Sequence, residues 1–183
     1  MKPISLAGKS PAELEKVFYS FPLPDDTPGK VAYWLYKRGI RDWDEMDNVK
    51  KNVRRILSGY FFPGDSIPLT GMADKDGTKK YLFKFSGERF VETVYIPDGK
   101  RHTLCVSSQA GCRMGCAFCN TGRNGFYGNL TAEEIVTQLY SIPERKKITH
   151  LVFMGMGEPL DNVDEVIRAT KVFTAEWGFS LSR

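Results

Sequence analysis

The chain has 183 residues, of which 42% are hydrophobic and 26% charged, and its formal net charge is +4. This composition excludes a disordered chain, and no stretch has the apolar length of a signal peptide or a bilayer-spanning helix. We therefore expect a cytoplasmic globular protein of one large or two small domains with no membrane contact; the mildly basic charge permits a phosphate-bearing partner without requiring one.

The N-terminal third is predicted to be helical. A capping box at residues 10–13 begins the first helix, Thr27 and Pro28 begin the second, which ends at Gly39, and a third begins near Asn48. The third helix sets Lys50, Lys51, Arg54 and Arg55 against an apolar face. These cations predict a nucleic-acid surface on one interpretation and a solvated helix face on the other.

After Pro68 the hydrophobic pattern changes from helical spacing to alternation. Tyr81, Phe83 and Phe85 share one face of a strand, and a further strand runs over residues 90–96, so antiparallel hairpins are expected. A break at residues 97–99 precedes strands that alternate with helices. We therefore predict an accessory domain of helices and hairpins over residues 1–97, contacting RNA, and an α/β domain over residues 98–183.

The second part contains two predicted strand–loop–helix units. The first joins the strand Thr103–Ser107 to a helix with a capping box at Thr131. The second joins a buried strand, Ile148–Met154, to a helix capped by Asn162 with Glu165. Because sites in parallel α/β proteins form at the carboxyl ends of strands, the loops of both units should face one pocket.

Three of the four cysteines, Cys112, Cys116 and Cys119, lie within eight residues of the first loop. A cytosolic setting disfavours structural disulfides, so thiols this close indicate a metal site. Three neighbouring thiolates suit three irons of an iron–sulfur cube and leave one iron open, whereas zinc usually takes two separated ligand pairs. The CxxxCxxC spacing, with Phe118 before the last cysteine, resembles the radical S-adenosylmethionine superfamily.

The alternative is a zinc site with four cysteine ligands, of which Cys105 would be the fourth. It is less favoured because Cys105 lies in a predicted strand, where the pleat fixes its side chain. A disulfide within the loop is disfavoured further.

The second loop reads Gly-Met-Gly-Glu-Pro over residues 155–159. Glycines there would let the backbone approach a ligand closely, and Glu158 can accept hydrogen bonds from an ammonium group, which S-adenosylmethionine carries. The alternative interpretation is a plain strand-to-helix turn with a solvated glutamate.

Three phrases, at residues 91–97, 103–112 and 154–160, together resemble the RlmN-type RNA methyltransferases. The resemblance implies an α/β fold, namely a radical SAM partial (β/α) barrel preceded by the accessory domain. It also implies methylation of carbon 2 of an adenine in 23S rRNA and, in dual-specific bacterial members, of an adenine in tRNA. Because that carbon offers no electron pair to a sulfonium methyl group, a radical route is required.

The resemblance also assigns roles to residues. It implies that Cys112, Cys116 and Cys119 hold a [4Fe-4S] cluster reduced by a donor such as a flavodoxin or ferredoxin. It further implies that Gly157 and Glu158 bind S-adenosylmethionine, that Glu92 accepts a proton, and that Cys105 forms a disulfide with a second, methyl-carrying cysteine.

The chain departs from the family in one respect. It ends after two strand–helix units of the family's partial barrel, and no cysteine remains to carry the methyl group. We therefore expect either a fragment of a longer enzyme or a short protein that cannot perform the reaction unaided. The alternative function is a catalytically inactive iron–sulfur or zinc module that binds RNA.

Overall fold

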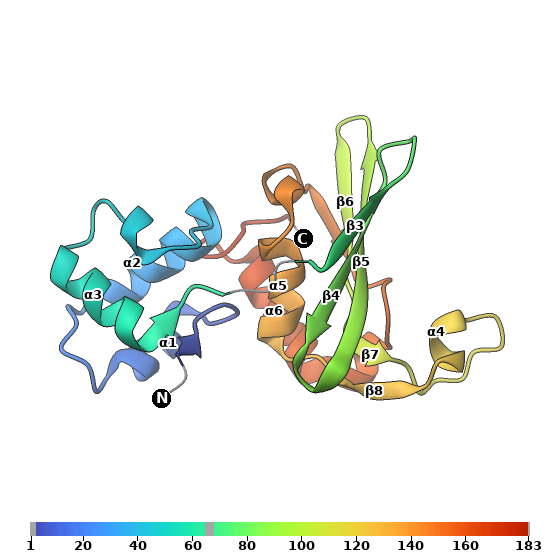
Figure 1. Ribbon diagram of the computed structural model, residues 1–183, viewed down its shortest axis with the longest axis horizontal. Helices are drawn as coiled ribbons and strands as arrows, with labels where there is room; N and C mark the ends of the chain where they lie inside the picture. Colours follow the sequence, from blue (N-terminus) through green and yellow to red (C-terminus); the bar gives the residue numbers. More distant parts are fainter. Residues whose placement is uncertain (1–2, 65–67, 183) are drawn as a thin grey trace.

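The computed structural model describes residues 3–64 and 68–182. Figure 1 shows α1, α2 and α3 gathered at one end, a twisted sheet at the other, and α5 and α6 between them against one face of the sheet. The α-helices are α1 (Pro11–Phe18), α2 (Thr27–Tyr33), α3 (Lys51–Tyr60), α4 (Asn120–Arg123), α5 (Ala132–Tyr140) and α6 (Val163–Thr174). Short helical turns are η1 (Trp34–Arg38), η2 (Trp43–Glu45), η3 (Ser86–Glu88), η4 (Pro143–Lys146) and η5 (Pro159–Asn162). The strands are β1 (Ile4–Ser5), β2 (Phe61–Phe62), β3 (Thr70–Ala73), β4 (Lys79–Phe85), β5 (Arg89–Asp98), β6 (Arg101–Cys105), β7 (Gln109–Gly111), β8 (Phe126–Asn129) and β9 (His150–Val152).

The N-terminal helices form where the sequence predicts them. The capping box of α1 is present, since the backbone N–H of Ser10 donates to Glu13 at 2.8 Å and the Ser10 hydroxyl accepts from the Glu13 N–H at 3.2 Å. The second helix runs through α2 into the π-helical turn η1 and ends at Gly39, whose φ of 66° is left-handed. The third helix begins at Lys51, slightly later than expected. None of the described helices is long and apolar enough to cross a membrane.

The main sheet has five strands in the order β3-β4-β5-β6-β9. The pairs from β3 to β6 are antiparallel, as the hairpin pattern predicts, and β6 pairs with β9 in parallel. The boundary predicted between residues 97 and 98 falls at the end of β5, and the sheet continues through the pairing of β5 with β6. The division into two domains remains a prediction.

The prediction of a buried strand over Ile148–Met154 is wrong in its length and its burial. The strand β9 covers only His150–Val152 and is half-exposed. Within the described residues it lies at the edge of the sheet and pairs with β6 alone, so water reaches its other side.

Two buried polar contacts fasten the helical layer to the sheet. The side chain of Gln138 on α5 accepts hydrogen bonds from the Thr93 hydroxyl at 2.7 Å and the Ser107 N–H at 2.8 Å. On η4, the Glu144 carboxylate accepts from Tyr81 Oη and Lys79 Nζ, both at 2.6 Å. Burial alone would raise the pKa of Glu144, but the hydrogen bonds from Lys79 and Tyr81 outweigh it and hold that pKa below its usual range.

The Tyr81 hydroxyl provides a stability test. Tyr81→Phe should lower the free energy of unfolding by about 1.5–3 kcal/mol, because it removes a hydrogen bond to a buried carboxylate. Since the pKa of Glu144 is depressed in the folded state, its stabilisation is present above the unfolded-state pKa and is lost as the pH falls through the folded-state value. Urea unfolding at neutral pH measures the loss caused by Tyr81→Phe, and urea unfolding at acidic pH measures the loss of the stabilisation that Glu144 provides. Tyr127→Phe, at a side chain 66% exposed, is the matched control, and an equal effect of the two substitutions would contradict the role of Tyr81.

Candidate functional site

The uncovered face of the sheet carries Glu92 and Cys105. Cys105 lies opposite Val94 in the pairing of β5 with β6, and Glu92 is two residues from Val94 along β5, so all three side chains share one face. Thr93 points the other way, toward α5. The Glu92 carboxylate is 46% exposed and forms an ion pair with Lys80 at 3.2 Å. The structure therefore brings these two predicted residues together at the carboxyl end of β6.

Cys105 is only 9% exposed. Burial raises the pKa of its thiol, and a hydrogen bond from the Met154 backbone partly opposes this. Cys105 is also fixed from both sides, because it pairs in register with Val94 on one strand and Val152 on the other. A zinc site that includes Cys105 would require it to leave a central strand, which argues against that alternative.

The cysteine loop is held at its base by a hairpin that the sequence analysis missed. The strands β7 and β8 pair antiparallel and bracket residues 112–125, and the Cys112 N–H donates to Gly125 O at 3.0 Å. Cys112 is buried, Cys119 half-buried and Cys116 exposed. The Gly122 backbone donates to the Cys119 sulfur and lowers the pKa of that thiol, which favours the thiolate that a metal needs.

The donor set of this loop fits an iron–sulfur cluster. Three thiols lie on one loop with an exposed member, and an N–H group donates to the sulfur at each end, from Met114 to Cys112 at 3.5 Å and from Gly122 to Cys119. Among the described residues, no three His, Cys, Asp or Glu side chains are gathered tightly enough for a single ion. Such a loop can close around a cluster, which is larger than one ion, while Cys112 stays anchored.

The Gly-Glu loop, residues 155–159, packs directly on the segment that leaves β6. The Met156 N–H donates to Ser107 Oγ at 2.8 Å, and the Glu158 N–H donates to Gln109 Oε1 at 2.9 Å. Gly157 has a φ of 99°, and a Cβ there would lie 2.7 Å from the Gln109 backbone nitrogen. Its lack of a side chain is thus required by contact between the two loops, a reason that the sequence pattern could not reveal.

Glu158 is half-exposed beside this contact. Its Oε1 accepts a hydrogen bond from the Leu160 N–H at 3.0 Å and so caps η5. Within the part of the chain that the structure describes, no hydrogen bond is recorded for its other oxygen, Oε2. One oxygen therefore has a structural role, and the other can accept a donor from a ligand.

A polar clamp, defined by Gln109, Arg113 and Asp161, joins the cysteine loop to the Gly-Glu loop. The fully buried Gln109 donates from Nε2 to Asp161 Oδ2 at 2.8 Å, and Arg113, next to Cys112, forms an ion pair with the same oxygen at 2.7 Å. The Arg113 guanidinium also lies over the Phe126 ring at 4.2 Å. The two loops thus share one support.

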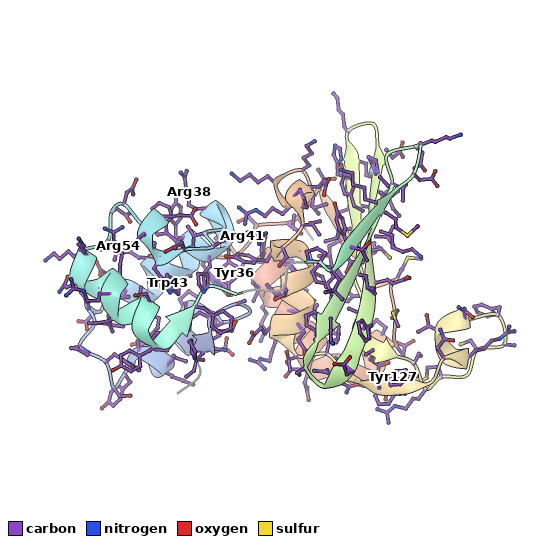
Figure 2. The ribbon with its side chains drawn as sticks, viewed as in Figure 1. Tyr36, Arg38, Arg41, Trp43, Arg54 and Tyr127 are labelled. Carbon is purple, nitrogen blue, oxygen red and sulfur yellow. The ribbon has the colours of Figure 1, made fainter. Side chains whose placement is uncertain are left out.

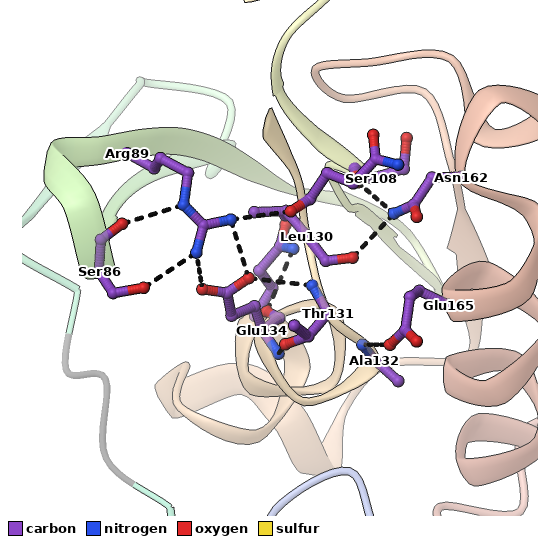
Figure 3. A network of polar contacts seen from close by, with 11 residues as sticks. Ser86, Arg89, Ser108, Leu130, Thr131, Ala132, Glu134, Asn162 and Glu165 are labelled. Atoms are coloured by element: carbon purple, nitrogen blue, oxygen red, sulfur yellow. Dashed lines mark hydrogen bonds and ion pairs between the residues drawn. The ribbon is translucent and has the colours of Figure 1, made fainter. Parts of the chain in front are cut away.

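Asn162 occupies the predicted N-cap position of α6, but the predicted capping by its side chain is wrong. Asn162 makes no capping bond; its Nδ2 donates instead to Ser108 O at 2.9 Å and Leu130 O at 2.8 Å (Figure 3). Glu165 accepts from the Ala132 N–H at the start of α5. Asn162 thus binds the neighbouring segment, where unpaired backbone groups are buried, whereas Glu165 binds both that segment and Arg168 of its own helix.

Arg89 supports the far side of the same region. It forms an ion pair with Glu134 at 2.6 Å and donates to Asn129 O at 2.8 Å, so it ties the start of β5 to the end of β8 and to α5 (Figure 3). This contact therefore fixes β8, the strand that follows the cysteine loop and leads into α5.

The cationic surface predicted on α3 is only partly free. Lys50, Lys51 and Arg55 are exposed, but Arg54 donates to Asp44 O at 2.7 Å and lies 3.5 Å from its carboxylate. Figure 2 shows Arg54 among the N-terminal helices. The use of this face for RNA stays a prediction.

The chain is similar to several known proteins. The model of the radical SAM superfamily matches residues 106–179, which include the three loop cysteines and the Gly-Glu loop. A "Probable dual-specificity RNA methyltransferase RlmN" of Phocaeicola vulgatus is 45% identical over 97% of this chain and 51% of its own length. One of the same name from Bacteroides fragilis is 46% identical over 100% of this chain and 53% of its own length.

A solved structure is also similar. The crystal structure of a radical SAM methyltransferase from Sphaerobacter thermophilus has a TM-score of 0.88 and 33% identity, covering 98% of this chain and 55% of that one. The chain spans about half the length of the curated relatives it matches.

These matches place the chain in the radical SAM superfamily and confirm the expected α/β fold class with part of a radical SAM barrel. Within that superfamily the chain matches the N-terminal half of the RlmN-type methyltransferases. The predicted [4Fe-4S] cluster and S-adenosylmethionine are the cofactors of this superfamily. The disulfide expected from the resemblance is not seen, since all four cysteines are free.

The polar clamp predicts a local effect of one substitution. Gln109→Leu should speed amide hydrogen exchange in residues 112–125 and 155–161 together, because both loops lose the same support. Exchange followed by mass spectrometry measures this, and Asn52→Leu on the exposed face of α3 is the control. Faster exchange in only one loop would show that the clamp does not couple them.

Thiol labelling tests the placement of the cysteines. With a maleimide at neutral pH, Cys116 should react fastest and Cys105 slowest, because Cys105 is buried and its pKa is raised. Peptide mapping after short labelling times gives the order. Labelling of Cys105 as fast as Cys116 would place it outside the sheet.

Proposed function

We propose that this chain supplies the cofactor-binding half of a radical S-adenosylmethionine-dependent RNA methyltransferase that acts on adenine C2 of 23S rRNA and, in dual-specific fashion, of tRNA. The observation that carries the proposal is the joining of the cysteine loop to the Gly-Glu loop through Gln109, beside Glu92 and Cys105. The names of the relatives support RNA as the substrate class.

Cys112, Cys116 and Cys119 would hold the [4Fe-4S] cluster. When bound, the cluster and S-adenosylmethionine supply a radical, which can react at a carbon that offers no electron pair. Glu158 would accept the ligand ammonium through Oε2, since Oε1 is occupied in capping η5. Gly157 would present its backbone to the ligand while its Cα remains packed on Gln109.

Glu92 and Cys105 would serve the substrate side of the reaction. Glu92 lies half-exposed on the open face, where its carboxylate can accept a proton from a bound base, and Lys80 holds it in place. Cys105 would form a disulfide with a second cysteine that is not among the four of this chain. Because its thiol is buried and its pKa is raised, Cys105 would react only after it becomes more exposed.

The proposal includes the partners and the location. Ribosomal RNA and tRNA are the substrates, an external donor such as a flavodoxin or ferredoxin provides the electron, and the cytoplasm is the compartment that supplies all of them. An inactive iron–sulfur or zinc module that binds RNA is the alternative.

Anaerobic reconstitution with iron and sulfide separates these functions. The chain should take up about four irons, and Cys112→Ala, Cys116→Ala and Cys119→Ala should each lose most of them. Cys105→Ala is the matched control and should retain its iron. One zinc per chain that is lost in Cys105→Ala would instead establish the zinc module.

Methyl transfer is the second readout of the same experiment. Together with the remaining half of a family member, the loaded chain should place a labelled methyl group on adenine C2, and Glu92→Gln should slow that transfer by about a hundredfold or more, as for loss of a general base. Transfer at an unchanged rate would remove Glu92 from the reaction.

A further inference from the structure

The N-terminal helices contact the helical layer on the sheet where residues 38–41 meet residues 140–145, a contact that we call the seam. Arginines form hydrogen bonds across it. Arg41 donates to Ser141 O at 3.1 Å, and Arg145 donates to Arg38 O at 2.8 Å. The Tyr140 hydroxyl donates to Ile40 O across the same contact. Figure 2 shows Arg41 between the N-terminal helices and α5. The seam therefore brings together segments about a hundred residues apart.

Six cations gather on this seam, and we call them the seam cations. They are Lys37, Arg38 and Arg41 at the end of η1, and Arg145, Lys146 and Lys147 at the end of η4. Within residues 3–64 and 68–182, none of them forms an ion pair with a carboxylate. Their recorded hydrogen-bond partners are neutral oxygens, including the Ser180 hydroxyl, which accepts from Lys37.

Arg145 and Lys37 are the half-buried members, and Arg145 is the one whose pKa burial lowers. Burial lowers its pKa most, Tyr140 opposes this, the nearby positive charge of Arg41 lowers the pKa further, and Glu45 raises it least. The Glu45 carboxylate itself accepts the backbone N–H groups of Arg41 and Asp42. A partly desolvated cation without a paired anion is costly, so the site is electrostatically incomplete as it stands.

A cavity of about 180 Å³ opens beside Arg145. Its charged lining comes from Lys37, Arg145 and Lys146, and its apolar lining includes Leu139 and Phe179. Cations around an apolar floor suit a phosphate group with a sugar or base beside it. Guanidinium groups also match the geometry of phosphate oxygens in a way that isolated lysines do not.

We propose that the seam cations bind the phosphate backbone of RNA, at a site separate from the sheet face that carries Glu92 and Cys105. This inference rests on the proposed function, from which RNA is taken as the partner. Its own support is the unpaired charge, the half-buried Arg145 and the cavity. The site differs from the α3 face that the sequence suggested, and it would hold the RNA across both parts of the chain.

The test compares variants that remove equal charge. The seam variant is Arg38→Gln, Lys146→Gln and Lys147→Gln, at exposed side chains that do not hold the seam closed. The control variant is Lys16→Gln, Lys75→Gln and Lys100→Gln, at exposed positions on α1 and in two hairpin turns. A third variant, Lys50→Gln, Lys51→Gln and Arg55→Gln, removes the free cations of the α3 face.

Binding of a short synthetic RNA hairpin is measured by fluorescence anisotropy over a series of KCl concentrations. The seam variant should weaken binding by about tenfold or more and reduce the slope of log K against log salt by about two, since each lost phosphate contact contributes about 0.7–0.9. The control should change neither quantity appreciably. Thermal unfolding of each variant verifies that the fold is retained.

The other outcomes overturn the inference in distinguishable ways. A seam variant that binds like the control, while the wild-type protein binds RNA, removes the seam site and leaves RNA as the partner. Equal loss in all three variants shows a response to net charge alone and also removes the seam site. Absence of RNA binding by the wild-type protein at low salt overturns the seam site together with the RNA partner of the proposed function.

Discussion

The arrangement of the site depends on how the chain leaves β6. Immediately after Cys105, Ser107 donates from its hydroxyl to Glu92 O at 2.6 Å and accepts from the Met156 N–H, while its backbone exchanges two hydrogen bonds with Gln138 of α5. The two bonds to Gln138 are buried, so breaking either of them leaves a buried polar group without a partner. One fully buried serine thus fixes the strand of Glu92, the strand of Cys105 and the Gly-Glu loop to one another.

This constraint explains how a stable sheet can support a loop that must accommodate a cofactor. The base of the cysteine loop is held by the hairpin of β7 and β8 and by Gln109, whereas Cys116 at its exposed part is free of the packed layer. The Gly-Glu loop is held by the same side chain. A loop supported at its base and exposed at its tip offers its thiols to a cluster while its supports stay packed on the segment that leaves β6.

Much of this could be predicted from local sequence patterns. The capping boxes at Ser10 and Thr131 and the alternation around Tyr81 depend on neighbouring residues, and those elements formed as expected. The role of Asn162 and the clamp of Gln109 with Asp161 depend on contacts between distant segments, which no local pattern encodes. The same holds for the seam cations, whose two groups, residues 37–41 and 145–147, lie about a hundred residues apart in the sequence and meet only because the two parts of the chain pack together.

The central claim is that the two loops form one binding site for S-adenosylmethionine. Calorimetric titration of S-adenosylmethionine into the cluster-loaded and the iron-free chain tests it most directly, with Glu158→Gln, in cluster-loaded form, as the third sample. The account predicts that binding to the loaded wild-type chain is at least about tenfold tighter than in either other sample, because each lacks a charged or coordinating contact worth about 1.4 kcal/mol or more. Equal affinity in all three samples would contradict it.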